Sequence, residues 1–273
     1  MISFPNCKIN LGLNILRKRA DGYHDLETIF FPLPLTDVIE VVKFPEAAAD
    51  IQFSSTGLTV NGKLEDNLCI RAYRLLQKDF PQLPPVKIHL HKVIPMGAGL
   101  GGGSANAAFM MKLLDKKFHL QLTNEKLLDY SLQLGSDCPF FVINKPAIGT
   151  GRGEFLQTIS LDLSAYSFLL VDPAIHINTA WAFSQLAAPV ARRPVHEVMQ
   201  LPIESWKYEL VNDFEEPVCN FHPALRQVKE TLYEAGALYA SMSGSGSCFY
   251  GIFPKNKVPG SLNIPPTYSV FSF

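Results

Sequence analysis

The chain has 273 residues, of which 47% are apolar and 18% charged, so it can bury a sizeable core and form two domains. Its formal net charge is −1, from 24 basic and 25 acidic residues, which argues against a nucleic-acid or membrane-surface partner. Five dispersed cysteines without a CxxC pair favour free thiols in the core and a cytoplasmic location. No stretch approaches the ~20 apolar residues that a membrane span needs.

Hydrophobic periodicity predicts a mixture of strands and helices in the first part of the chain. We expect strands at 38–43, 51–54, 86–93 and 140–143, helices at 67–80, 104–118 and 124–134, and a turn at Asn61-Gly62. Asp66 and Ser104 are the expected N-caps of the first two helices, and Gly135 is expected to end the third. That third helix is expected to bury Leu127, Leu128, Ser131 and Leu132. The strict alternation at 86–93 predicts a half-buried antiparallel strand.

The glycine-rich segment 149–153 interrupts this pattern. We place a domain boundary close after it, which gives domains at 1–155 and 156–273. The second domain is expected to contain strands at 167–171, 238–241 and 248–253 and helices at 179–186 and 223–235. A loop of small residues, 241–247, joins the last two strands.

The most informative segment is the glycine-rich run at 95–108. Five of the seven residues from 97 to 103 are glycine, and a strong helix-forming sequence follows directly. A backbone this bare can fold tightly around an anion, and the following helix adds the positive end of its dipole. We interpret the run as a phosphate-binding loop for ATP.

Two other phosphate-binding motifs fit this loop less well. Residues 97–102 satisfy G-x-G-x-x-G, but the strand before them alternates Lys87, His89 and His91 on one face, unlike a buried Rossmann strand. No acidic residue follows at the position that would bind a ribose. The P-loop pattern fails as well, because Gly62-Lys63 is followed by Leu64.

Residues 95–108 resemble the second signature of the GHMP kinases, small-molecule kinases named for galactose, homoserine, mevalonate and phosphomevalonate. The variant G-G-G-S-A-N-A is similar to one branch, which acts on a cytidylyl-linked polyol. Residues 5–13 with 19–26, then 134–141 and 243–247, resemble the other motifs of that branch, in the expected order. We therefore identify the chain as a member of this family.

The resemblance implies an α+β, two-domain GHMP kinase-like fold, with an N-terminal domain like domain 2 of ribosomal protein S5 and a ferredoxin-like C-terminal domain. It implies an ATP-dependent kinase that phosphorylates the 2-hydroxyl of 4-diphosphocytidyl-2-C-methyl-D-erythritol in non-mevalonate isoprenoid precursor biosynthesis. A monomer or weak homodimer is expected. Mg²⁺ is expected with ATP, but no protein ligand is assigned, because no glutamate lies between Ser104 and Leu122.

The expected catalytic residues are Lys8 and Asp137. By resemblance Asp137 is the general base, whereas the residues alone allow it to stabilise its own turn. Lys8 lies in an apolar strand, and a buried lysine needs a carboxylate partner, for which Asp137 is the candidate. The alternative for Lys8 is solvent exposure on an edge strand. Asn10, two residues on and thus on the same face, is expected to bind the polyol near the reacting hydroxyl.

The remaining site residues also follow from the resemblance. The ATP site is expected to comprise Pro95, Met96, Gly97, Ala98, Gly99, Leu100, Gly101, Gly102, Gly103, Ser104 and Ala105, with Asn106 and Ser245 as further candidates. Tyr23 is expected to stack on the cytosine and His24 to hydrogen-bond its edge. Phe183 is the expected second aromatic wall, with Trp181 as an open alternative.

Two other functions stay open on the sequence. A GHMP kinase for another alcohol, such as homoserine or mevalonate, would have no use for the Tyr23-His24 turn. A non-catalytic ligand sensor on the same fold would not need Lys8 and Asp137.

Overall fold

The computed structural model describes residues 1–44, 49–60 and 62–273, so Asn61 of the expected turn lies outside the described residues. These residues form two compact units. Unit 1 comprises Met1–Cys7, Pro34–Met96 and Gly101–Asn144, and unit 2 comprises Lys8–Leu33, Gly97–Leu100 and Lys145–Phe273. The chain passes between them within two long strands, β2 (Asn6–Lys18) and β3 (His24–Thr36). A domain boundary after residue 155 stays a prediction.

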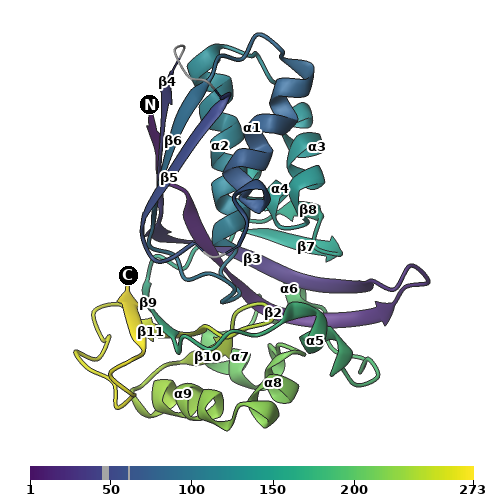
Figure 1. Cartoon of the computed structure of the whole chain (residues 1–273). Coiled ribbons are helices and arrows are strands. Elements are labelled where there is room, and N and C mark those ends of the chain that lie inside the picture. Colours follow the sequence, from purple (N-terminus) through teal and green to yellow (C-terminus); the bar gives the residue numbers. More distant parts are fainter. Residues whose placement is uncertain (45–48, 61) are drawn as a thin grey trace. The chain divides into compact units, whose positions relative to one another are not determined.

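Unit 1 combines a four-stranded sheet with helices on one of its faces (Figure 1). The sheet order is β1 (Ile2–Ser3), β4 (Val38–Lys43), β6 (Val86–Lys92) and β5 (Ile51–Gly57). A short 3-10 helix (Leu64–Asp66) is followed by α1 (Leu68–Asp79), α2 (Gly102–Phe118), α3 (Asn124–Leu134) and α4 (Cys138–Ile143). β6 is half-buried as predicted, but it pairs antiparallel with β4 and parallel with β5, so the antiparallel expectation is right for one neighbour only.

Unit 2 contains two further sheets. One has the order β2, β3, β7 (Ala147–Gly151), β8 (Phe155–Thr158), and the other β10 (Tyr239–Met242), β11 (Phe249–Pro254), β9 (Tyr166–Asp172), β12 (Ser269–Ser272). Its helices are α5 (Thr179–Ser184), α6 (Val195–Val198), α7 (Ile203–Glu209), α8 (Glu215–Phe221) and α9 (Pro223–Glu234). α9 packs against β10 and β11, and its buried residues Leu225, Val228 and Leu232 join their core (Figure 1). The strands and helices predicted for this part are confirmed.

Two helix starts differ from the prediction. The side chain of Asn67, not Asp66, caps α1 by accepting from the Cys69 N–H. α2 begins at Gly102 rather than Ser104, because Gly101 adopts a left-handed conformation (φ 69°) that glycine tolerates and so becomes the N-cap. The helix therefore starts inside the glycine run.

The expected strand at 140–143 is wrong, since these residues belong to α4. A short apolar run can be a buried strand or a buried helix, and Pro139 in the first turn suits a helix start. The sequence predicts that the segment 149–153 interrupts the pattern of strands and helices. In the structure its first residues belong to β7 and pair with β3. On α3 the expected inward Leu132 is 41% exposed, and Leu134 is buried instead.

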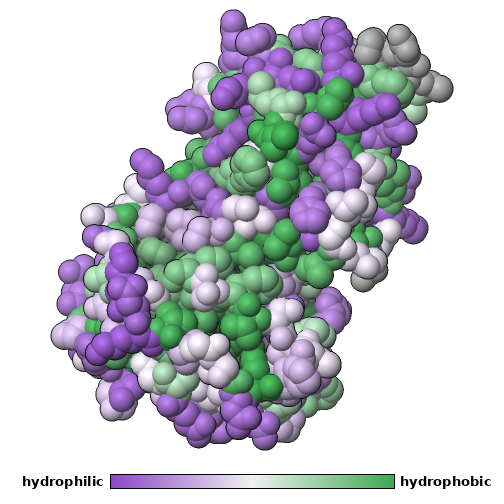
Figure 2. All heavy atoms as spheres, turned by 90° about the vertical axis from the view of Figure 1, so that its left-hand side faces the viewer, coloured by the Kyte–Doolittle hydropathy of each residue, from purple (hydrophilic) through white to green (hydrophobic). Residues whose placement is uncertain are grey.

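All five cysteines are free and buried, as the sequence predicts. Hydrophilic and hydrophobic side chains are interspersed on the face shown in Figure 2. Within the described residues, no helix is long and apolar enough to cross a membrane.

Candidate active site

Lys8 lies on β2 with only 3% of its surface exposed, so it faces inward rather than solvent. Its Nζ donates to Asn10 Oδ1 at 2.6 Å and to the Gly99 carbonyl at 3.0 Å. The ammonium also lies 5.3 Å from the ring centroid of Phe30. The Lys8 backbone N–H donates to the Leu100 carbonyl at 3.0 Å, so this strand and the first part of the glycine loop are joined within unit 2.

The glycine loop can adopt its path in unit 2 only because it lacks side chains. Gly97 and Gly99 have φ values of +66° and +79°. A Cβ on Gly99 would lie 1.8 Å from the Ser243 carbonyl oxygen, and one on Gly97 would lie 2.9 Å from His176 Nδ1. The Ser243 hydroxyl donates to the Gly99 carbonyl at 2.9 Å. The second and last signature motifs are therefore in contact, which the sequence did not predict.

The part of the loop in unit 1 forms the start of α2. Gly102 is buried, and a Cβ there would lie 2.9 Å from both Ile94 Cγ2 and Lys92 Nζ. The N-cap of this helix is Gly101, which has no side chain to accept from the first turn. The N–H groups of the first turn and the positive end of the helix dipole suit a phosphate.

Asp137 is half-buried at the start of α4, directly after the turn that ends α3. Ser104 of α2 lies beside this turn, with its hydroxyl 3.9 Å from the position of a Cβ on Gly135. Burial raises the pKa of the Cys138 thiol to about 12, a shift that Ser104 opposes by hydrogen bonding and Asp137 reinforces by charge. Within unit 1 the structure thus brings Asp137 close to the α2 start. Pairing of Asp137 with Lys8 stays a prediction.

The aromatic residues expected around the base lie in unit 2. The rings of His24 and Phe183 stack with centroids 5.0 Å apart, whereas Trp181 packs on Phe221 at 4.7 Å. Burial and the nearby Lys18 charge lower the pKa of His24, which favours the neutral imidazole. Of the two aromatics left open by the sequence, Phe183 is the one in contact with His24.

Tyr23 is 56% exposed and lies in a turn closed by a hydrogen bond from the Arg19 N–H to the Tyr23 carbonyl. Asp21 accepts from the Tyr23 N–H at 3.1 Å and so fixes the turn. The guanidinium of Arg152 lies 4.6 Å from the Tyr23 ring centroid.

Asn106, a further candidate for the ATP site, lies near the start of α2. Its side chain is buried and donates to Asp37 Oδ2 at 2.8 Å. Asp37, fully buried, also binds Lys92 Nζ at 2.5 Å and the backbone N–H groups of Val93 and Ile94. Asn106 therefore anchors α2 to the segment before the glycine loop.

Sequence reasoning assigned no site role to several residues that lie close to the expected site residues, namely Thr28, Arg152, His176 and Ser243. Of these, Ser243 does belong to the last signature motif. Each lies far along the chain from the residue that it contacts. No periodicity or local motif pairs such positions, so single-sequence patterns could not have shown these contacts.

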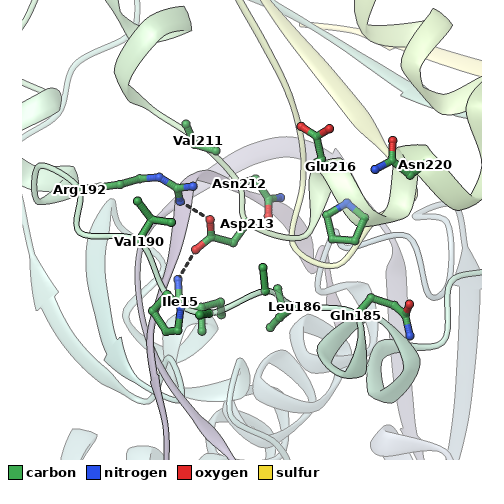
Figure 3. A pocket seen from close by; sticks show the side chains of 14 residues that line it. Ile15, Gln185, Leu186, Val190, Arg192, Val211, Asn212, Asp213, Glu216 and Asn220 are labelled. Atoms are coloured by element: carbon green, nitrogen blue, oxygen red, sulfur yellow. Dashed lines mark hydrogen bonds and ion pairs between the residues drawn. The ribbon is translucent and has the colours of Figure 1, made fainter.

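A separate pocket of about 400 Å³ lies in unit 2 (Figure 3). Its lining comprises Ile15, Gln185, Leu186, Ala187, Ala188, Pro189, Val190, Arg192, Val211, Asn212, Asp213, Glu216, Pro217 and Asn220. Asp213 pairs with Arg192 and accepts from the Ile15 N–H at 2.7 Å. None of the predicted site residues lines this pocket.

Comparison with known proteins agrees with the motifs. The GHMP kinases N terminal domain model matches residues 67–145, and the GHMP kinases C terminal model matches residues 203–260. The chain therefore belongs to the GHMP kinase family, and the predicted α+β fold class is confirmed.

Within this family, two curated relatives carry the same enzyme name. The chain is 47% identical to the 4-diphosphocytidyl-2-C-methyl-D-erythritol kinase of Bacteroides fragilis, over 94% of both chains. It is 46% identical to the enzyme of the same name from Azobacteroides pseudotrichonymphae, over 100% of both.

Solved structures show the same fold. A crystal structure of 4-(cytidine 5'-diphospho)-2C-methyl-D-erythritol kinase matches with a TM-score of 0.80 and 29% identity, over 92% of this chain and 90% of that one. Homoserine kinase from Cytophaga hutchinsonii matches with a TM-score of 0.67 over 98% of this chain and 94% of that one. At 13% identity, the second match shows the fold alone.

Proposed function

We propose that this chain is an ATP-dependent kinase that phosphorylates the 2-hydroxyl of 4-diphosphocytidyl-2-C-methyl-D-erythritol, in isoprenoid precursor biosynthesis. The observation that carries the proposal is the 46% identity to a kinase of that name over the whole of both chains. The stacked His24 and Phe183 add a wall suited to a flat base. The assignment to isoprenoid precursor biosynthesis follows from the substrate in the relatives' name, 4-diphosphocytidyl-2-C-methyl-D-erythritol.

In the proposed mechanism, Asp137 accepts the proton of the acceptor hydroxyl as its oxygen attacks the γ-phosphorus, and ADP leaves. Lys8 offsets the negative charge that spreads over the transferred group. Hydrogen bonds to Asn10 and to the Gly99 carbonyl hold the ammonium in place. Asn10 is proposed to bind the polyol near the reacting oxygen.

The glycine loop is proposed to bind the ATP phosphates, because the first turn of α2, whose N-cap is a glycine, offers N–H groups to an anion. Mg²⁺ is proposed to arrive with ATP, since it is commonly held through substrate phosphates and water. Tyr23, His24 and Phe183 are proposed to bind the cytosine. The cytoplasmic location and the monomer or weak homodimer stay predictions.

The test is an ATP-consumption assay on the purified chain with three acceptors: the cytidylyl methylerythritol substrate, homoserine and mevalonate. Turnover with the first alone is expected. Turnover with either of the others instead would keep the phosphate loop and refute the cytosine site. ATP binding without turnover of any acceptor would favour the ligand sensor.

A further inference from the structure

Thr28 lies on β3, is fully buried, and stands beside Asn10 on the neighbouring strand β2. Its Oγ1 donates to the Gly12 carbonyl at 2.5 Å and lies 3.0 Å from Asn10 Nδ2, which donates to it. A threonine hydroxyl has one proton. Because that proton points to Gly12, the oxygen can only accept from Asn10.

This arrangement fixes which way the Asn10 amide faces. With Nδ2 directed at Thr28, Oδ1 must point to the other side, where Lys8 Nζ donates to it at 2.6 Å. The reversed amide would present its NH₂ group to the ammonium, placing two donors face to face. The hydroxyl of Thr28 therefore selects the amide orientation that can bind Lys8.

We propose that Thr28 is a positioning residue for phosphoryl transfer, acting through Asn10 on the place of the Lys8 ammonium. The proposal rests on the proposed kinase function. Thr28 has no exposed surface, so it acts through its neighbours rather than on the substrate. An ammonium displaced by about 1 Å lowers the rate by as much as ~10²-fold in well-positioned sites.

Other contacts hold the Asn10 backbone independently of Thr28. The Asn10 N–H donates to Ser243 Oγ at 3.3 Å, and the Tyr250 hydroxyl donates to the Asn10 carbonyl at 2.7 Å. A change at Thr28 is therefore expected to reorient the Asn10 side chain while β2 stays in place.

The test compares Thr28→Val, which keeps the shape and removes the hydroxyl, with Thr28→Ser, which keeps the hydroxyl. Thr28→Val is expected to lower kcat on the order of 10- to 10²-fold with the KM for ATP nearly unchanged. Thr28→Ser is expected to restore most of the rate. Wild-type kcat in Thr28→Val would overturn the proposal, as would an equal loss in Thr28→Ser.

A double-mutant cycle separates positioning from general damage. In an Asn10→Ala background, Thr28→Val should have no further effect on kcat, because the amide that it orients is gone. Additive losses would refute the proposal. If Thr28→Val does not fold, Thr28→Cys, whose thiol is a weak donor and acceptor, replaces it in both comparisons. A wild-type chain inactive on the cytidylyl acceptor would instead refute the proposed function.

Discussion

The imidazole of His24 stacks on the ring of Phe183, with planes inclined by 21°. His24 begins β3 and Phe183 lies on α5, so two distant segments of the chain build one aromatic wall in unit 2. Phe183 also packs edge-on against Phe214, with centroids 4.8 Å apart. Because the buried ring of Phe214 supports Phe183, the plane of the wall is set by the core.

Phe183→Leu is expected to raise the KM for the cytidylyl acceptor on the order of 10-fold, because base–aromatic stacking contributes about 1–3 kcal/mol. The KM for ATP should stay the same. Trp181→Leu is the control, since Trp181 packs on Phe221. Steady-state kinetics of both variants check this, and a larger effect from Trp181→Leu would assign the wall to Trp181.

The pKa of His24 lies below its usual value because of burial and the Lys18 charge. The imidazole thus stays neutral in the folded chain at a pH where the unfolded chain, with an ordinary value of about 6.5, is already protonated. The free energy of unfolding is therefore unaffected by protonation of His24 above about pH 6.5. It decreases as the pH falls below that value, because the unfolded chain binds the proton first. The KM for the acceptor should be flat from about pH 8 to 6.5 and rise at lower pH as the imidazole protonates. His24→Asn should abolish this rise; a parallel rise in both proteins would contradict it.

Gly99→Ala is expected to destabilise the chain. The positive φ alone costs about 1–2 kcal/mol for an alanine, and its Cβ would collide with the Ser243 carbonyl at 1.8 Å. Gly103→Ala is the matched variant, because its Cβ would meet Leu68 at an ordinary 3.5 Å inside α2. It should raise the free energy of unfolding by up to ~1 kcal/mol. Urea unfolding of both measures this, and equal stabilities would refute the close approach.

Asp137→Asn is expected to lower kcat by roughly 10²–10⁴-fold if the carboxylate acts as the base. ATP binding, measured by calorimetry, should be retained because the α2 start is untouched. Asp129→Asn, an exposed carboxylate on α3, is the control and should keep wild-type kcat. A fully active Asp137→Asn would remove Asp137 from the mechanism.

Asp37→Leu is expected to destabilise the chain by about 3–5 kcal/mol, since it leaves the Lys92 ammonium buried without its partner. Arg17→Ala is the control, because it removes an ion pair with Asp25 in which the Arg17 side chain is 77% exposed. This variant should change the free energy of unfolding by at most ~1 kcal/mol. Thermal unfolding checks both. Similar losses in the two variants would show that burial does not distinguish the pairs.

Much of the candidate site was readable from local sequence. The glycine run and the helix after it follow from backbone freedom and period, and the shared face of Lys8 and Asn10 follows from strand alternation. The residues alone left open whether Lys8 faces inward, and the structure shows that it is buried. The prediction of a strand at 140–143 was wrong because a short apolar run has no periodicity that distinguishes a buried strand from a buried helix. The predicted start of α2 at Ser104 was wrong because a serine is a good side-chain cap, whereas the helix begins after Gly101, which adopts a left-handed conformation.

The sequence by itself determined the family, the glycine-rich motif and the chemical types of the candidate site residues, because these depend on residues close together in the chain. Only the tertiary structure decided that Phe183 rather than Trp181 lies on His24. It also decided that Asn106 binds Asp37 and that Thr28 orients Asn10. Such contacts join segments far apart in sequence. They are set by strand pairing and core packing, which a local sequence pattern does not predict.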